Sequence, residues 1–444
     1  MMERMFSKQD LKKMIIPLLL EQLLVLIVGM ADTFMVSNAG EEAVSGVSLV
    51  NNFNTIFIYI FTALASGGAV IISQYLGNKD SKNANRSASQ LLTFSLLVSI
   101  VILVLVLIFK RQLLSLFFGS VTDEVMSACL TYLTITALSY PALAIYNSGA
   151  SVFRSIGKTK VTMYVSFIAN LINVIGNYIG VFVLHAGVAG VAWPTFTSYI
   201  VEAVMITYLC CKKDNEVRYQ LKDVLTIDSD LIGRITHIAI PNSLEGAVFQ
   251  IVKVALSSIV ATFGTYQIAA NGVAQSIWSL AALTGQAMNP VFITVIGQTM
   301  GAQKSDEAEY YFKHLIKISL CIAIVWCSIV LALTPFLLTF TGISSEAKSL
   351  TFTLVLIHNI FCAFISPFNC IGSGLRAAGD VKYTMYTSIF ATLCVRLVLS
   401  YILAYWLNMG VIGIAWAMCM DWCARCILFI IRLKSGKWKQ FKLI

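Results

Sequence analysis

Long apolar stretches separated by short polar loops make up most of this chain. Each stretch contains at least the roughly 20 residues that a helix needs to cross the hydrocarbon core of a bilayer. Of the 444 residues, 58% are hydrophobic and only 12% are charged, and the charged fraction is about half that of a typical soluble domain. The pattern predicts an all-α integral membrane protein. Its twelve transmembrane helices are expected at residues 14–38, 45–76, 88–109, 125–153, 160–184, 188–211, 234–263, 267–300, 312–340, 346–374, 381–407 and 410–433.

Short motifs recur along the chain at a nearly constant offset of 222 to 224 residues. PLLLE at 17–21 matches PNSLE at 241–245, and GVAGVAW at 187–193 matches GVIGIAW at 410–416. QYLG at 74–77 and RSIG at 154–157 recur in the same order, as QTMG at 298–301 and RAAG at 376–379. The repeat predicts two six-helix lobes. Because six crossings return the chain to its starting side, the lobes point the same way and should be related by a pseudo-two-fold axis along the membrane normal.

The repeat and the polar stretches also set the expected domain boundaries. We expect an N-lobe at 1–211, a cytoplasmic linker at 212–233, a C-lobe at 234–433 and a basic cytoplasmic tail at 434–444.

The basic residues predict how the chain crosses the membrane. The net charge is +9, and 25 of the 31 Lys and Arg residues fall in segments that lie on one side if both termini share it. Only Lys110, Arg111 and Lys348 fall in loops on the opposite side. Positive charge is enriched in cytoplasmic loops, so both termini are expected in the cytoplasm, with the protein in the cell (inner) membrane. This spread over short loops also argues against nucleic acid as a partner.

The first apolar segment carries two carboxylates, Glu21 and Asp32. Eleven residues of helix place them on nearly the same face, about 16 Å apart along the axis. A carboxylate at membrane depth costs several kcal/mol, so it is retained where it faces protein or water and has a function. This face is therefore predicted to line a polar cavity.

Amide side chains in the fifth segment are placed to meet Asp32. Asn170, Asn173 and Asn177 share one helix face, and Asn177 lies at about the depth of Asp32. Thr195 follows Pro194, which should free a backbone carbonyl at the start of the sixth segment. Such oxygens suit Na⁺, with Asp32, Asn173 and Asn177 as its ligands, or a proton held on Asp32. The alternative is that the amides only bind helices together.

The second half has its own polar positions. Glu245 matches Glu21 in the repeat, and Gln250 and Lys253 follow on the same helix as candidates for substrate binding or coupling. Lys253 needs an acid, either Glu245 or one on another helix. Asp421 and Arg425 are spaced i,i+4 and are expected to pair. Partners for Arg396 and Glu202 cannot be assigned from the sequence.

No catalytic motif stands in a credible context, so the chain is not expected to be an enzyme. The P-loop, HExxH and Ser/His/Asp patterns are absent from the sequence. The 11 cysteines lie in or beside apolar segments and are expected to be free thiols. Without a nucleotide-binding motif, transport would be driven by an ion gradient or by the gradient of the substrate itself.

Together these residues resemble the multidrug and toxic compound extrusion (MATE) family of secondary antiporters, bacterial type. The resemblance covers nearly the whole chain and is carried by GMADTFMVSNAG at 29–40, the QYLG and QTMGA ends at 74 and 298, GTYQIAAN at 264–271, and Leu375-Arg376 with Asp380. It implies twelve helices in two lobes and a cation site formed by Asp32, Asn173, Asn177 and Thr195. It also implies that Glu245 is the acid of the C-lobe. Some members carry Asp at position 177, or an acid in the tenth helix, where this chain reads ISPFN at 365–369.

The resemblance implies export of drug-like, often cationic organic compounds in exchange for Na⁺ or H⁺, by alternating access. Beyond the coupling ion no cofactor is expected, and the partners would be small organic cations and membrane lipids, with the protein a monomer. The alternatives are an exporter or flippase of a lipid-linked saccharide or another metabolite, a non-coupled channel, and a membrane-bound enzyme.

Overall fold

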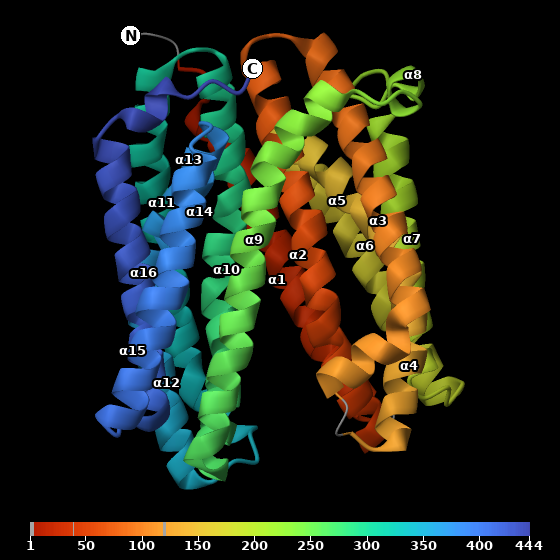
Figure 1. Ribbon diagram of the computed structural model, residues 1–444, viewed down its shortest axis with the longest axis vertical. Coiled ribbons are helices and arrows are strands. Elements are labelled where there is room, and N and C mark those ends of the chain that lie inside the picture. The colour runs from red at the N-terminus through yellow and green to blue at the C-terminus, as the bar shows by residue number, and fades with distance from the viewer. Residues whose placement is uncertain (1–3, 39, 119–120) are drawn as a thin grey trace. The chain divides into compact units, whose positions relative to one another are not determined.

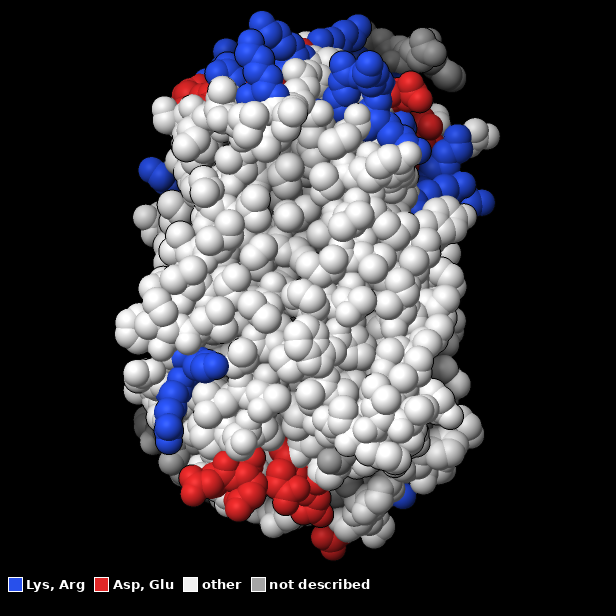
Figure 2. All heavy atoms as spheres, turned by 90° about the vertical axis from the view of Figure 1, so that its right-hand side faces the viewer, with Lys and Arg blue, Asp and Glu red and all other residues white. Residues whose placement is uncertain are grey.

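The computed structural model of the chain describes residues 4–38, 40–118 and 121–444, and within these ranges it contains helices and no strand. Eleven helices in these ranges are long and apolar enough to cross a membrane, or twelve if the bent pair α4 and α5 forms one span. The prediction of an all-helical membrane protein with up to twelve crossings is therefore confirmed. Figure 2 shows a broad belt with few charged side chains, between an end rich in Lys and Arg and an end with Asp and Glu.

The chain forms two compact units, which we call the first unit, Phe6–Ile240, and the second unit, Pro241–Ile444 with residues 4 and 5. The long helices of each unit lie side by side (Figure 1). The first unit contains α1 Lys8–Ser37, α2 Glu41–Gly77, α3 Ser81–Phe118, α4 Asp123–Ala137, α5 Tyr140–Ser155, α6 Thr159–Tyr178, the π-helix η1 Ile179–Val183, α7 Ala189–Cys210 and α8 Leu221–Val224.

The two units meet within α9 Ser229–Val260, at Ile240 and Pro241. The second unit then continues through η2 Ala261–Phe263, α10 Thr265–Gly301, α11 Ser305–Thr339, α12 Ser345–Asn369, α13 Ile371–Ala377, α14 Val381–Phe390, η3 Ala391–Leu397, α15 Val398–Tyr401, η4 Ile402–Trp406, α16 Gly410–Lys434 and η5 Lys437–Gln440.

The internal repeat is visible in the backbone. Residues with positive φ recur at the same offset, and most of them end or begin a helix. The pairs are Gly40 and Gly264, Lys79 and Gln303, Gly157 and Gly379, His185 and Asn408, and Gly187 and Gly410. Positive φ is costly for most residues, so its recurrence at five matched places indicates that the two halves share one backbone plan.

Each unit has its own apolar core. In the first, Phe53, Phe61 and Tyr140 are buried, and the Tyr140 hydroxyl donates to Asn54 Oδ1 at 2.7 Å. In the second, a core cluster from α9, α10, α11, α12 and α16 includes Val252, Ile277 and Cys327. Outside the core, α3 exposes Val101, Leu105 and Ile108. An apolar outer surface of this kind is stable in lipid and unfavourable in water.

The segment expected as a linker, 212–233, packs onto α3 of the first unit. Gln90 is fully buried, and its amide nitrogen donates to the carbonyls of Asp223 and Thr226, both at 2.6 Å. Its amide oxygen accepts from the backbone of Asp228 at 2.9 Å. One side chain thus satisfies three backbone groups of the segment, which fixes its course along α3.

The basic segment at 434–444 packs on the second unit. Trp438 is fully buried with its ring edge against Phe312. Lys439 lies 2.8 Å from Glu309 and 2.9 Å from Asp306 on α11. Hydrogen bonds to these two carboxylates raise the pKa of Lys439.

A buried ion pair joins α1 to α5 in the first unit. Arg154 Nη2 lies 2.6 Å from Glu21 Oε1, and the Thr162 hydroxyl donates to Glu21 Oε2 at 2.7 Å. Only 3% of Glu21 is exposed. Both carboxylate oxygens therefore have partners, and three helices are held together at this point.

We predict that Arg154→Gln lowers the free energy of unfolding by about 3–5 kcal/mol, because it leaves a buried carboxylate without its countercharge. Thermal unfolding of the purified protein in detergent would measure the change. The double variant Glu21→Gln/Arg154→Gln should regain most of the loss. A double variant no more stable than Arg154→Gln would contradict this account of the ion pair.

A second prediction concerns the contact between η1 and the start of α7. A Cβ on Gly180 would clash with the Gly190 carbonyl oxygen, a backbone atom that cannot move away alone. Gly180→Ala should therefore destabilise the first unit by about 1–3 kcal/mol or more through overpacking. Gly29→Ala is the matched control, because nothing lies within 4 Å of the added Cβ. Equal melting temperatures for the two variants would refute the prediction that the contact at Gly180 leaves no room for a side chain.

Candidate functional site

The carboxylate of Asp32, near the end of α1, is bound by an amide of α6. Asn177 Nδ2 donates to Asp32 Oδ1 at 2.7 Å. Asn177 is fully buried, whereas Asp32 is only half-buried. The Asp32 carboxylate therefore has one hydrogen-bonding partner in Asn177, and part of the side chain remains accessible from outside the protein.

Close packing of α6 against α7 brings the other polar groups into reach. A Cβ on Gly176 would lie 2.7 Å from the Pro194 ring, so the two helices approach closely at this level. Asn173 and Asn177 flank Gly176 on α6, and Thr195 follows Pro194 on α7. The glycine and the proline thus position the amides opposite the hydroxyl.

Asn173 connects Asp32, Asn177 and Thr195. In one amide orientation, Asn173 Oδ1 accepts from Asn177 Nδ2 at 3.1 Å and Nδ2 donates to Thr195 Oγ1 at 3.2 Å. In the other orientation, Asn173 Nδ2 donates to Asp32 Oδ1 at 2.9 Å, and its oxygen accepts from the Thr195 hydroxyl at 3.2 Å. The second orientation pairs donors with acceptors better. All four residues that the sequence singled out are neighbours in either case.

One oxygen of this cluster is left without a hydrogen bond. Asn177 Oδ1 is buried and has no hydrogen-bonding partner among the described residues. A buried carbonyl oxygen without a partner costs free energy, which a cation or a water molecule could recover. The described residues contain no group of three or more His, Cys, Asp or Glu side chains placed to hold a metal ion. A single carboxylate with neutral oxygens fits a monovalent hard cation or a proton better than a divalent metal.

Two other polar residues of the first unit lie outside this cluster. Asn170 shares the α6 face as expected, but its amide donates to Ser166 at 3.3 Å. Glu21 is paired with Arg154 and Thr162. These partners account for an acid at this position in a membrane helix without a role in ion binding.

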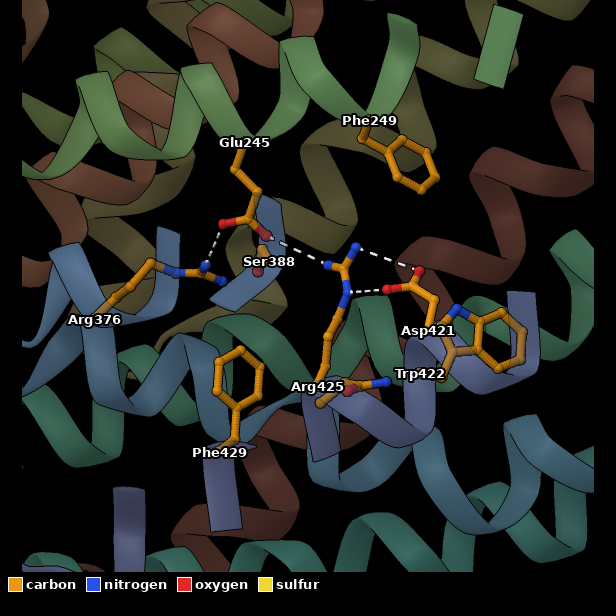
Figure 3. A pocket seen from close by; sticks show the side chains of 9 residues that line it. Glu245, Phe249, Arg376, Ser388, Asp421, Trp422, Arg425 and Phe429 are labelled. Atoms are coloured by element: carbon orange, nitrogen blue, oxygen red, sulfur yellow. Dashed lines mark hydrogen bonds and ion pairs between the residues drawn. The ribbon is translucent and has the colours of Figure 1, made fainter. Parts of the chain in front are cut away.

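The second unit contains a polar pocket of about 150 Å³, shown in Figure 3. Glu245 lines it, with Oε2 3.0 Å from Arg376 Nη1 and Oε1 3.7 Å from Arg425 Nη1. Arg425 also pairs with Asp421, Nε to Oδ1, at 2.9 Å. The lining is completed by Phe249, Asn369, Ser388, Trp422 and Phe429.

The pairing expected between Asp421 and Arg425 is thus present, and Arg396 lies 3.9 Å from the same aspartate. The partners of Glu245 are arginines and not Lys253, which is exposed and forms no ion pair with the described residues. Gln250 is not among the residues that line the pocket.

Arg376 and Arg425 are the pocket residues that sequence reasoning did not assign to Glu245. The repeat contained a signal for Arg376, because it stands where Arg154 stands in the first half, and Arg154 pairs with Glu21. No such signal existed for Arg425, because the matching position in the first half is Glu202.

His358 packs between aromatic rings. It is buried beside Trp278 and Trp422, and neither ring nitrogen has a hydrogen-bonding partner among the described residues. These surroundings are those of a packing residue in the core of the second unit.

Comparison with known proteins shows to which family the chain belongs. Over 436 residues it is 26% identical to the uncharacterized transporter YisQ of Bacillus subtilis (strain 168), covering 96% of this chain and 93% of that protein. It is 23% identical to the probable multidrug resistance protein NorM of Thermotoga maritima, covering 98% of this chain and 93% of that protein.

Among solved structures, a transporter of the MOP superfamily from Pyrococcus furiosus has a similar fold. The TM-score is 0.91 at 21% identity, over 98% of this chain and 97% of that one. That structure is described as having a binding pocket of reverse polarity that suggests a different function. The MatE family profile matches residues 17–179 and 241–402, one stretch in each half of the repeat. The chain therefore belongs to the MatE family of multidrug and toxic compound extrusion transporters.

Proposed function

We propose that this protein is an antiporter that exports small organic compounds by alternating access, driven by the entry of Na⁺ or H⁺. Members of its family are transporters and not enzymes, and its relatives include proteins named for multidrug resistance. The coupling ion is assigned to Asp32, Asn173, Asn177 and Thr195. The observation that carries this assignment is the buried Asn177 Oδ1, which accepts no hydrogen bond from the residues that the structure describes and lies beside a half-accessible carboxylate.

Coupling in this proposal follows from competition for one set of oxygens. A proton on Asp32 and a Na⁺ ion would both occupy the same carboxylate, so only one binds at a time. Transport then requires that the ion and the exported compound prefer different states of the protein by a few kcal/mol. Exchange of one monovalent ion for one monovalent cation moves no net charge. The membrane potential, worth about 2.3 kcal/mol per charge per 100 mV, then contributes nothing.

The sequence suggests four further residues for substrate binding or coupling: Glu245, Gln250, Lys253 and Glu21. The proposal does not give all four a role. Both Glu245 and Glu21 face guanidinium groups, so the proposal assigns neither as an ion carrier. Glu245 keeps a place in the substrate pocket as the countercharge that holds Arg376 and Arg425. Gln250 and Lys253 have no assigned role.

The resemblance to the family favours an organic cation as the substrate. The structure contains one polar region suited to a cation and a second region suited to an anion. The Asp32 cluster is acidic, whereas three arginines and two acids meet around the pocket of the second unit.

Asp32→Asn should reduce ion-driven efflux at least tenfold, because it removes the only carboxylate of the cluster. Efflux of a fluorescent substrate from proteoliposomes, under separately imposed Na⁺ and pH gradients, would measure the loss and identify the ion. Asn177→Ala should weaken the dependence on Na⁺ severalfold if Na⁺ is the coupling ion. Asn170→Ala is the matched control on the same helix and should retain wild-type efflux. Undiminished efflux by Asp32→Asn would reject the proposal.

The excess of basic residues on one side of the membrane leads to a prediction about topology, with both termini in the cytoplasm. A fluorescent protein fused after Ile444 should fold and fluoresce, and an alkaline phosphatase fused there should be inactive. A phosphatase inserted in the loop at 341–344, between α11 and α12, should be active and serves as the matched control. The reverse activities would invert the proposed orientation.

A further inference from the structure

The charges that converge around the pocket of the second unit do not balance. The ion-pair network that runs through the pocket contains the guanidinium groups of Arg376, Arg425 and Arg396 but only two carboxylates, of Glu245 and Asp421. Arg396 does not line the pocket and joins the network through Asp421, at 3.9 Å. His358, the other titratable group beside Arg396, is enclosed by tryptophan rings and offers no negative charge. One positive charge is left in excess within a bundle of apolar helices. Such an excess is unfavourable unless an anion or water compensates it.

The matching positions of the first unit have the opposite balance. Glu21 and Arg154 stand where Glu245 and Arg376 stand, and Ser166 stands where Ser388 does. At the position of Arg425, however, the first unit carries Glu202, of which 6% is exposed. At this position an acid is exchanged for an arginine between the two halves. Asp421 and Arg396 also lack charged counterparts, because the first half has Ser198 and, for Arg396, Asn173 or Val174 at the matching places.

Two hydrogen-bond donors of the pocket have no acceptor within hydrogen-bonding distance among the described residues. Ser388 Oγ lines the pocket, is buried, and has no hydrogen-bonding partner among the described residues. Arg425 Nη1 lies 3.7 Å from Glu245 Oε1, which is too long for a hydrogen bond. In Figure 3 the Arg425 guanidinium lies between Glu245 and Asp421, with Ser388 nearby. An acceptor bound here would satisfy donors that the protein leaves unused.

The size and the walls of the pocket limit what can bind. A volume of about 150 Å³ matches that of an engineered protein cavity that accepts a benzene ring. Phe249, Trp422 and Phe429 supply aromatic walls beside the charged groups. The side chains of Glu245, Arg376 and Arg425 remain 21%, 18% and 15% exposed, so the pocket is not sealed.

We propose that this pocket binds the carboxylate end of an aromatic organic anion, with Arg425 and Ser388 as donors to the carboxylate. Arginine binds carboxylates through charge-assisted hydrogen bonds that a point charge or a neutral donor does not match. The aromatic ring of the ligand packs against Trp422 and Phe249. The inference deepens the proposed function by naming a substrate class, and it rests on that function only in treating the ligand as a transported compound.

Binding of radiolabelled benzoate to the purified full-length protein in detergent tests the proposal. We expect saturable binding that unlabelled benzoate displaces and that benzamide and benzylammonium, of similar shape, displace at least tenfold more weakly. Arg425→Gln should weaken benzoate binding at least tenfold and Ser388→Ala severalfold. Lys434→Gln removes an exposed charge from the same helix and should bind as the wild type does.

Ser388→Ala keeps the test decisive if Arg425→Gln fails to fold, because the serine forms no hydrogen bond with the described residues. Displacement by benzamide as strong as by benzoate would show an apolar pocket and overturn the proposal. Complete displacement by an equal concentration of chloride would show a site for inorganic anions and would also overturn it.

Asp32→Asn separates this proposal from the preceding one, because it should reduce ion-driven efflux at least tenfold and leave benzoate binding intact. If benzoate does not bind to the wild type while Asp32→Asn still loses efflux, the pocket assignment fails and the coupling assignment stands.

Discussion

A charged side chain inside a membrane-spanning helix costs several kcal/mol unless another group of the protein pairs with it. This constraint governs the polar interior of both units. Glu21 is held by Arg154, Asp421 by Arg425, and the buried Asp380 by Arg432 at 2.5 Å. The pairs of Glu21 with Arg154 and of Asp380 with Arg432 join different segments, so they also fix how the helices pack, whereas Asp421 and Arg425 lie on one helix.

Asp32 differs from these acids, since its partner is a neutral amide and not a cation. An acid paired with arginine has its charge compensated within the protein. An acid bound only by amides and a hydroxyl keeps a charge that an ion from solution can compensate. The contrast between Asp32 and Glu21 on one helix therefore separates a residue that holds the fold from a residue able to exchange ions.

The two halves use one backbone plan for different purposes. Matched positive-φ residues and the acid–arginine pairs at 21/154 and 245/376 preserve the helix packing. At the position where the first half has Glu202, the second has Arg425. A single exchange of this kind changes a local balance of charge without disturbing the pair beside it. An internally duplicated transporter can in this way acquire two polar regions of opposite sign within one fold.

Several features of this protein were determined by the sequence alone. Apolar segment lengths predict the helices, because a bilayer demands about 20 residues per crossing, and the repeat predicts where the backbone pattern recurs. The approach of Asp32, Asn173, Asn177 and Thr195 could also be predicted, because helical periodicity and depth restrict which residues can meet. The partners of Glu245 could not, since Arg376 and Arg425 lie 131 and 180 residues away in sequence and competed with Lys253 on the same helix. Only tertiary packing selects among such distant charges, because ion pairing depends on distances of a few ångströms that no spacing along the chain specifies.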